Sequence, residues 1–218
     1  RAPSKVTRRA WFSPEEYKKL YQATRDRIKN PKNNKYIWHY EQMHDFVLFM
    51  ANTGLRPDEA YRLEYRDVTV TKDDATGQNI VVIEVRGKRG VGYCKSMPSA
   101  VFPFQRLRKR NNPKPTDLLF PQNHHGLFNA ILDEEGLKFD REGQRRSSYS
   151  LRHTYICLRI MEGANVWQVA KNCRTSVEMI EKYYASHIAN SIDAESLNIM
   201  RKKPAKKAAK VLSPELAD

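Results

Sequence analysis

The chain has 218 residues, 40% of them hydrophobic, which predicts one large domain with a sizeable core. Its 39 Lys and Arg against 25 Asp and Glu leave a formal charge of +14. Such a charge attracts polyanions, so nucleic acid is the expected partner. No apolar run approaches the roughly 20 residues of a membrane-spanning helix, and no signal-peptide core is evident, so we expect no membrane partner and a cytoplasmic location.

The cysteines and histidines do not form a metal-binding pattern. Cys94, Cys157 and Cys173 are odd in number and lack C-x-x-C spacing, and the six histidines include no H-E-x-x-H pair. We therefore expect reduced, structural cysteines and chemistry that uses neither a metal nor another cofactor.

A capping box opens the first expected helix. Ser13 suits the N-cap, Pro14 the first helical position and Glu16 the third, and apolar residues follow at helical spacing. A second, buried helix is predicted from the apolar periodicity of residues 43–50, and Gly54 provides its stop signal.

A small antiparallel sheet is expected next. Residues 68–70 and 80–85 favour strands and flank a polar turn, which indicates a hairpin. A second turn leads into residues 91–94 and places Lys88 at an exposed tip. The remaining pattern predicts helices over residues 103–110, 127–137, 151–161, 166–171 and 177–184. The predicted fold class is therefore α+β, mainly α, with a small antiparallel three-stranded sheet.

Three short motifs stand out when they are taken together. Residues 53–60 read Thr-Gly-Leu-Arg-Pro-Asp-Glu-Ala, residues 150–154 read Ser-Leu-Arg-His-Thr, and residues 175–184 end in Lys-Tyr-Tyr. In order and spacing they resemble the tyrosine recombinases, or phage integrases, from the first capped helix to about His187. Each motif alone is weak, but four matching elements in the right order, with a hairpin lysine among them, are specific.

The resemblance implies a particular active site. In that family two arginines, a lysine in a β-turn and a late tyrosine converge on one DNA phosphate, and the matching positions here are Arg56, Arg152, Lys88 and Tyr184. It implies attack by Tyr184, a covalent link to the 3′ phosphate, and rejoining without ATP or metal. Lys88 is then a candidate general acid, although a plain contact to the DNA backbone explains it nearly as well.

The residue types suit this chemistry. Arginine stays protonated and offers paired donors that match phosphate oxygens, so we expect Arg56 and Arg152 to clamp the phosphate and stabilise its transition state. A phenol has a pKa of about 10, so Tyr184 needs a base or a strongly cationic setting, which we expect the two arginines to supply.

Two positions depart from the family pattern. Tyr149 stands where the usual H-x-x-R motif begins, and Thr175 stands where histidine or tryptophan is usual, after Arg174 in place of a frequent glycine. Both can donate a hydrogen bond to phosphate, but neither carries a proton near neutrality. His153 is a candidate to take over part of that work. A buried aromatic role for Tyr149 and a helix N-cap role for Thr175 are equally good interpretations.

Tyr184 has a close competitor in its neighbour. Tyr183 shares a helix face with Met179 and Ile180, so we expect Tyr183 to pack and Tyr184 to react. We expect Glu59 to be structural and to orient the first arginine.

The resemblance also implies an organisation and a biological setting. Residues 1–12 are expected to be a linker or the remnant of a missing N-terminal DNA-binding region, 13–190 the recombinase catalytic domain, and 191–218 a C-terminal helix and basic tail. The implied function is site-specific recombination or integration for a prophage or mobile element, in a tetrameric synapse on double-stranded DNA. Accessory DNA-bending proteins and a bacterial nucleoid location go with it. The alternative is an accessory DNA-binding protein that keeps the fold and has lost catalysis.

Overall fold

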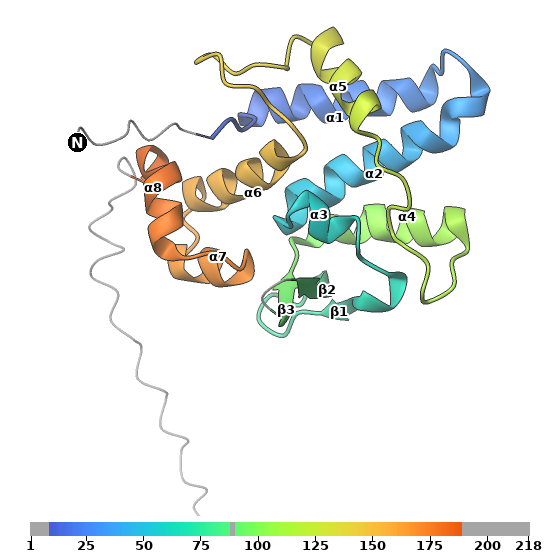
Figure 1. Ribbon diagram of the computed structural model, residues 1–218. Coiled ribbons are helices and arrows are strands. Elements are labelled where there is room, and N and C mark those ends of the chain that lie inside the picture. Colours follow the sequence, from blue (N-terminus) through green and yellow to red (C-terminus); the bar gives the residue numbers. More distant parts are fainter. Residues whose placement is uncertain (1–8, 88–89, 189–218) are drawn as a thin grey trace, which may run out of the picture.

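The computed structural model describes residues 9–87 and 90–188, which form a helical body with a small sheet at one side (Figure 1). Helix α1 (Pro14–Lys29) begins with the predicted capping box. Ser13 Oγ accepts the Glu16 amide at 3.2 Å, and the Glu16 carboxylate accepts the Ser13 amide at 2.9 Å. These two side chains satisfy backbone N–H groups that a helix start leaves without a helical partner.

The central helix is α2 (Ile37–Thr53), which follows the 3-10 turn η1 (Asn34–Tyr36). It packs against α1, α4 (Val101–Asn111) and α6 (Tyr149–Met161), so most of its side chains are buried. Because α1, α4 and α6 all pack against it, α2 lies at the centre of the domain's hydrophobic core. Among the helices of the described ranges, none combines the length and apolar character needed to cross a membrane.

The predicted three-stranded antiparallel sheet is confirmed. Strands β1 (Val68–Lys72), β2 (Asn79–Gly87) and β3 (Gly90–Lys95) pair in the order β1-β2-β3. The short helix α3 (Pro57–Ala60) and the turn η2 (Tyr65–Asp67) connect α2 to this sheet.

One face of the sheet joins the core. Val68 pairs with Ile83, which pairs with Cys94 on the next strand, and all three side chains are buried. These three residues lie on the same face of the sheet, as expected for a sheet that packs one face on the core and leaves the other to solvent. Lys88, expected at the tip of the β2–β3 turn, lies outside the described residues.

Two helices follow the sheet. The turn η3 (Pro98–Ala100) leads into α4, and α5 (His125–Glu134) comes after a long connection. The prediction that this helix reaches residue 137 is wrong. Gly136 adopts a φ of +65°, a left-handed conformation that ends helices, so α5 stops ahead of it.

The last three helices form a smaller group. Helices α6, α7 (Val166–Asn172) and α8 (Val177–Ile188) lie together on one side of the molecule (Figure 1). They share a second cluster of buried side chains: Tyr155, Ile156, Cys157, Ile160, Val169, Ala170, Cys173, Ile180 and Tyr184. The cluster fixes α8 against α6. The motif at residues 150–154 therefore contacts the motif at residues 175–184.

The segment before α1 belongs to the packed structure. Ala10 and Phe12 are buried, and the Phe12 amide donates to Thr154 Oγ1 of α6 at 2.9 Å. The buried guanidinium of Arg146 donates to the Trp11 carbonyl at 2.8 Å. The core therefore includes residues ahead of position 13, where the domain was expected to begin.

Candidate active site

The site begins at the turn that joins α2 to α3. Gly54 ends α2 with a φ of +66°, in the region that favours glycine. A Cβ atom on Gly54 would lie 2.3 Å from Cδ1 of Tyr155, so packing against α6 excludes a side chain as well. The turn delivers Arg56 to the N-cap of α3.

A buried carboxylate holds the first arginine. Glu59 Oε1 accepts from Arg56 Nη1 at 2.8 Å, and Oε2 accepts from the Arg56 amide at 2.8 Å. Nη2 of Arg174 also contacts Oε2 of Glu59. Burial works against the charge of Arg56, but Glu59 and Tyr149 outweigh it and raise the arginine's pKa. The expected orienting role of Glu59 agrees with these contacts.

The second arginine connects two turns. Arg152 is buried in α6, and its Nη1 and Nη2 donate to the carbonyls of Gly54 at 2.5 Å and Cys173 at 2.6 Å. Arg56 Nη2 donates to the neighbouring carbonyl, that of Arg174, at 3.0 Å. Both guanidiniums are therefore anchored to the turn between α7 and α8, which lies directly before the helix of the expected nucleophile.

The expected nucleophile contacts a histidine. His153 Nδ1 lies 2.5 Å from the Tyr184 hydroxyl, and both side chains are buried. Burial, Arg9 and Arg152 lower the pKa of His153 to about 3. Both groups are therefore neutral near pH 7, and in the imidazole tautomer with its proton on Nε2 the Nδ1 atom accepts a hydrogen bond from the phenol.

The electrostatic setting of Tyr184 differs from expectation. Burial raises the pKa of its phenol above the ordinary value, although Arg9 and Arg152 act in the opposite direction. In the chain without DNA, desolvation of the phenolate thus outweighs the nearby cations. The cationic setting expected from the two arginines therefore does not bring the phenol's pKa below its ordinary value in this state.

These side chains surround one pocket of about 150 Å³. Its lining includes six of the seven residues expected in the site: Arg56, Tyr149, Arg152, His153, Thr175 and Tyr184. Arg9, Ile156, Met179 and Tyr183 complete it. Arginine side chains from three separate segments make it a cationic cavity with a phenol in its wall, which suits a phosphate group.

The two departures from the family pattern both reach this pocket. Tyr149 lies beside His153, with ring centroids 5.5 Å apart, and its hydroxyl helps to raise the pKa of Arg56. Thr175 lines the pocket, and the cap of α8 is its neighbour: Ser176 Oγ accepts the Met179 amide at 3.2 Å. The N-cap interpretation of Thr175 is therefore wrong.

The two adjacent tyrosines differ in burial. Tyr184 is 5% exposed and belongs to the second core cluster, whereas Tyr183 only packs against the edge of that cluster. The expectation that Tyr183 is the more deeply packed of the two is wrong. Tyr184 nevertheless presents its hydroxyl to His153 and lines the pocket, because α8 turns that edge of the ring toward α6.

Arg174 occupies a position where the family often has glycine. Its φ of +51° lies in the left-handed region, which explains why glycine suits the turn between α7 and α8. The arginine side chain packs on β3, where a Cβ on Gly92 would lie 2.8 Å from its Cδ, and it reaches Glu59. The sequence showed that arginine stands where glycine is frequent, but it did not show the ionic contact of Arg174 with Glu59.

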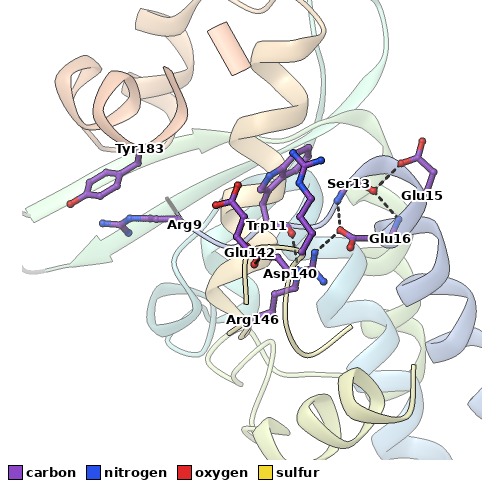
Figure 2. A pocket seen from close by; sticks show the side chains of 10 residues that line it. Arg9, Trp11, Ser13, Glu15, Glu16, Asp140, Glu142, Arg146 and Tyr183 are labelled. Atoms are coloured by element: carbon purple, nitrogen blue, oxygen red, sulfur yellow. Dashed lines mark hydrogen bonds and ion pairs between the residues drawn. The ribbon is translucent and has the colours of Figure 1, made fainter. Parts of the chain in front are cut away.

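Arg9 was also missed. It lines the pocket, and its guanidinium lies 4.2 Å from the centre of the Tyr183 ring, an arrangement that Figure 2 shows from the neighbouring pocket. The only signal in the sequence was the basic composition of residues 1–10, which does not single out one arginine.

The described part of the chain contains no group of three or more His, Cys, Asp or Glu side chains that could hold a metal ion. All three cysteines are buried and unpaired. Burial raises the pKa of Cys94 to about 12, so this thiol is unreactive as a nucleophile.

No protein-family model matches the sequence, and no curated protein matches it. Solved structures do match. The XerH site-specific recombinase bound to its difH substrate gives a TM-score of 0.62 at 20% identity, covering 85% of this chain and 53% of XerH. The catalytic domain of bacteriophage HP1 integrase gives 0.59 at 16% identity, covering 87% of this chain and 94% of that domain. The chain has the tyrosine recombinase catalytic-domain fold.

A third match supports the same assignment of the fold. The Tn1549 transposon integrase in complex with transposon right-end DNA gives a TM-score of 0.56 at 14% identity, covering 87% of this chain and 67% of the integrase. The tyrosine recombinase fold accounts for the helical body and for the three-stranded sheet. The chain spans only 53% of the length of XerH and 64% of the length of XerA recombinase.

Proposed function

We propose that this chain cuts and rejoins double-stranded DNA by transesterification, with Tyr184 as the nucleophile. The observation that supports this most strongly is the pocket that Arg56, Arg152, His153 and Tyr184 line together, with the Tyr184 hydroxyl in contact with His153. Motifs that lie far apart in the sequence meet there, and each supplies a group that phosphoryl transfer needs. The similar fold of recombinases and integrases agrees with the proposal.

The two arginines bind the scissile phosphate. Each guanidinium carries five N–H donors, and the contacts to Glu59 and to turn carbonyls fix its plane without using them all. A guanidinium that is already oriented stabilises the charge that develops on the nonbridging oxygens without reorganising during the reaction. Tyr149 and Thr175 donate further hydrogen bonds to the same oxygens.

Attack starts at Tyr184. Its oxygen forms a bond to phosphorus while its proton passes to Nδ1 of His153, and the bond between phosphorus and the 5′ oxygen of the next nucleotide breaks. The product is a 3′-phosphotyrosyl link and a free 5′ hydroxyl. Lys88 gives the leaving oxygen its proton, a role that rests on sequence alone. Rejoining is the reverse reaction and conserves the energy of the phosphodiester.

The wider setting is also part of the proposal. The charge of +14 suits a protein that embraces duplex DNA. We propose that residues 13–190 act as the catalytic domain in a tetrameric synapse, with 191–218 as its C-terminal extension and accessory DNA-bending proteins as partners. Integration of a prophage or mobile element, in the nucleoid of a bacterium, is the setting that fits.

A covalent-trapping experiment tests the reaction. Nicked DNA half-sites of randomised sequence release the short strand after attack, so rejoining stops and the protein–DNA link accumulates. We expect a denaturation-resistant adduct whose modified peptide, identified by mass spectrometry, contains Tyr184. Tyr184→Phe should abolish it, and the matched Tyr183→Phe variant should retain it.

The experiment also separates the alternative. An accessory protein without catalysis would bind the DNA in a salt-dependent manner and form no adduct with any sequence in the pool. That result, with wild-type chain shown to be folded, would overturn the enzymatic proposal. An adduct that maps to Tyr183 would overturn the assignment of the nucleophile alone.

A further inference from the structure

Arg9 lies where two pockets meet. One is the 150 Å³ pocket around Tyr184, and the other is a larger pocket of about 390 Å³ with Glu15, Asp140 and Glu142 in its lining. Arg9 and Tyr183 belong to both. Figure 2 shows the Arg9 side chain extended beside the Tyr183 ring. A cation thus lies in the shared wall of the candidate active site and the neighbouring pocket.

The backbone holds Arg9 at this place. Ala10 is buried, the Phe12 amide donates to Thr154 Oγ1 on α6 at 2.9 Å, and Arg146 donates to the Trp11 carbonyl at 2.8 Å. These contacts fix the chain directly after Arg9 against α6, the helix that carries Arg152 and His153. The ring of Tyr183, 4.2 Å from the guanidinium, supports the side chain by a cation–π contact.

The charge of Arg9 acts on the reacting groups. Among the side chains that the structure describes, the titratable and charged groups that contact the Tyr184 hydroxyl or act on its pKa include His153, Arg152 and Cys157 from α6, Cys173 from the α7–α8 turn, and Arg9. Arg9 and Arg152 are the cations that lower the pKa of Tyr184 against the effect of burial, and both also keep His153 neutral. Arg9 therefore favours the phenolate, whereas the same charge disfavours protonation of His153, so its two effects on proton transfer oppose each other. What remains as its contribution to the pocket is attraction for an anionic phosphate.

We infer that Arg9 is a third arginine of the phosphate-binding pocket, which binds the scissile DNA phosphate together with Arg56 and Arg152. This inference rests on the proposed function, because it names a further group that contacts the same substrate. It assigns an active-site role to the segment before α1. A linker without such a role would tolerate any residue at position 9.

The test compares the rate of adduct formation, on a half-site that reacts with wild type, among matched arginine variants. Arg9→Ala should lower the rate roughly 100-fold, as loss of one oriented donor does at other anionic transition states. Arg9→Lys should restore part of it, since charge returns without the planar fork. Arg141→Ala removes the same charge from an exposed residue of the neighbouring pocket and should change the rate by no more than about twofold.

A half-site with a neutral scissile group tests whether Arg9 acts by binding the negative charge of the phosphate or only by supporting the local structure. A half-site with a methylphosphonate at the scissile position lacks one anionic oxygen, so the difference between wild type and Arg9→Ala should shrink markedly on it. On the normal half-site, the pH at which the rate begins to rise should be higher for Arg9→Ala than for wild type. The reason is that the removed cation favoured the phenolate.

The outcomes are distinct. No adduct with wild type overturns the proposed function, and the role of Arg9 with it. An adduct with wild type, together with Arg9→Ala that matches Arg141→Ala in rate, overturns the role of Arg9 alone. A slow Arg9→Ala variant whose defect is the same on the methylphosphonate and is not rescued by lysine also overturns it. That pattern indicates damage to the packing around Tyr183, which the melting temperature would report.

Discussion

The Tyr184 hydroxyl and His153 Nδ1 lie 2.5 Å apart across the contact between α8 and α6. With a pKa of about 3, His153 is neutral in the folded chain, so its Nδ1 can accept the hydrogen bond of the phenol. We expect His153→Asn, which cannot take up that proton, to slow adduct formation by a factor of about 100 to 10,000. His125→Asn is the matched control at an exposed position of α5. Equal rates for the two variants in single-turnover assays would remove His153 from the mechanism.

The same burial predicts how stability depends on pH. The pKa of His153 falls from its ordinary value of 6.5 to about 3, and burial lowers the pKa of His44 to about 4. The unfolded chain therefore binds protons that the folded chain does not, so stability is full above about pH 6.5 and falls as the pH drops toward 3.

The size of this loss follows from the lowered pKa of each histidine, because a tenfold change in proton affinity corresponds to about 1.4 kcal/mol. Urea unfolding between about pH 7 and pH 4 should show a loss of several kcal/mol, and His153→Asn should flatten the dependence. A dependence equally steep in this variant would show that His153 is not neutral and buried.

Gly54 supplies a prediction about stability alone. Gly54→Ala places a β-carbon against the Tyr155 ring in a left-handed conformation, and we expect a loss of at least about 2 kcal/mol in the free energy of unfolding. Gly126 lies in α5, and a β-carbon added there would meet nothing within 4 Å. Gly126→Ala should therefore be neutral or stabilising by about 0.5–1 kcal/mol. Urea titrations measure both, and similar effects would refute the packing argument.

Arg174 combines an unfavourable backbone with a favourable side chain. Arg174→Ala loses the contact with Glu59 and keeps the left-handed φ of +51°, whereas Arg174→Gly loses the same contact and relieves the backbone. We expect the glycine variant to be more stable than the alanine variant by about 1 kcal/mol, although both fall below wild type. The reverse order in thermal unfolding would contradict the backbone assignment.

Local chemistry made much of the fold predictable. The capping box at Ser13, the stop at Gly54 and the strand-favouring runs on either side of a polar turn all depend on neighbours in sequence, and all three are found. Errors arose where the exact backbone path of a turn decides. Thr175 and Ser176 have equal capping chemistry, and the choice between them follows from the left-handed turn at Arg174.

The candidate site was predictable for a different reason. Motif order identified Arg56, Arg152 and Tyr184 without any knowledge of distances, and the pocket brings them together. Burial of Tyr184 and the approach of Arg9 depend on how distant segments pack, which no spacing in the sequence encodes.

The carbonyls of Cys173 and Arg174 accept hydrogen bonds from Arg152 and Arg56, and α8 begins only a few residues later. One short turn therefore joins the two arginines proposed to bind the phosphate to the helix of the proposed nucleophile. Substitutions in that turn and in either arginine should therefore have strongly non-additive effects on the cleavage barrier, since each disturbs the alignment that the other relies on. A change in one part of this unit of turn and arginines therefore calls for a compensating change in the other.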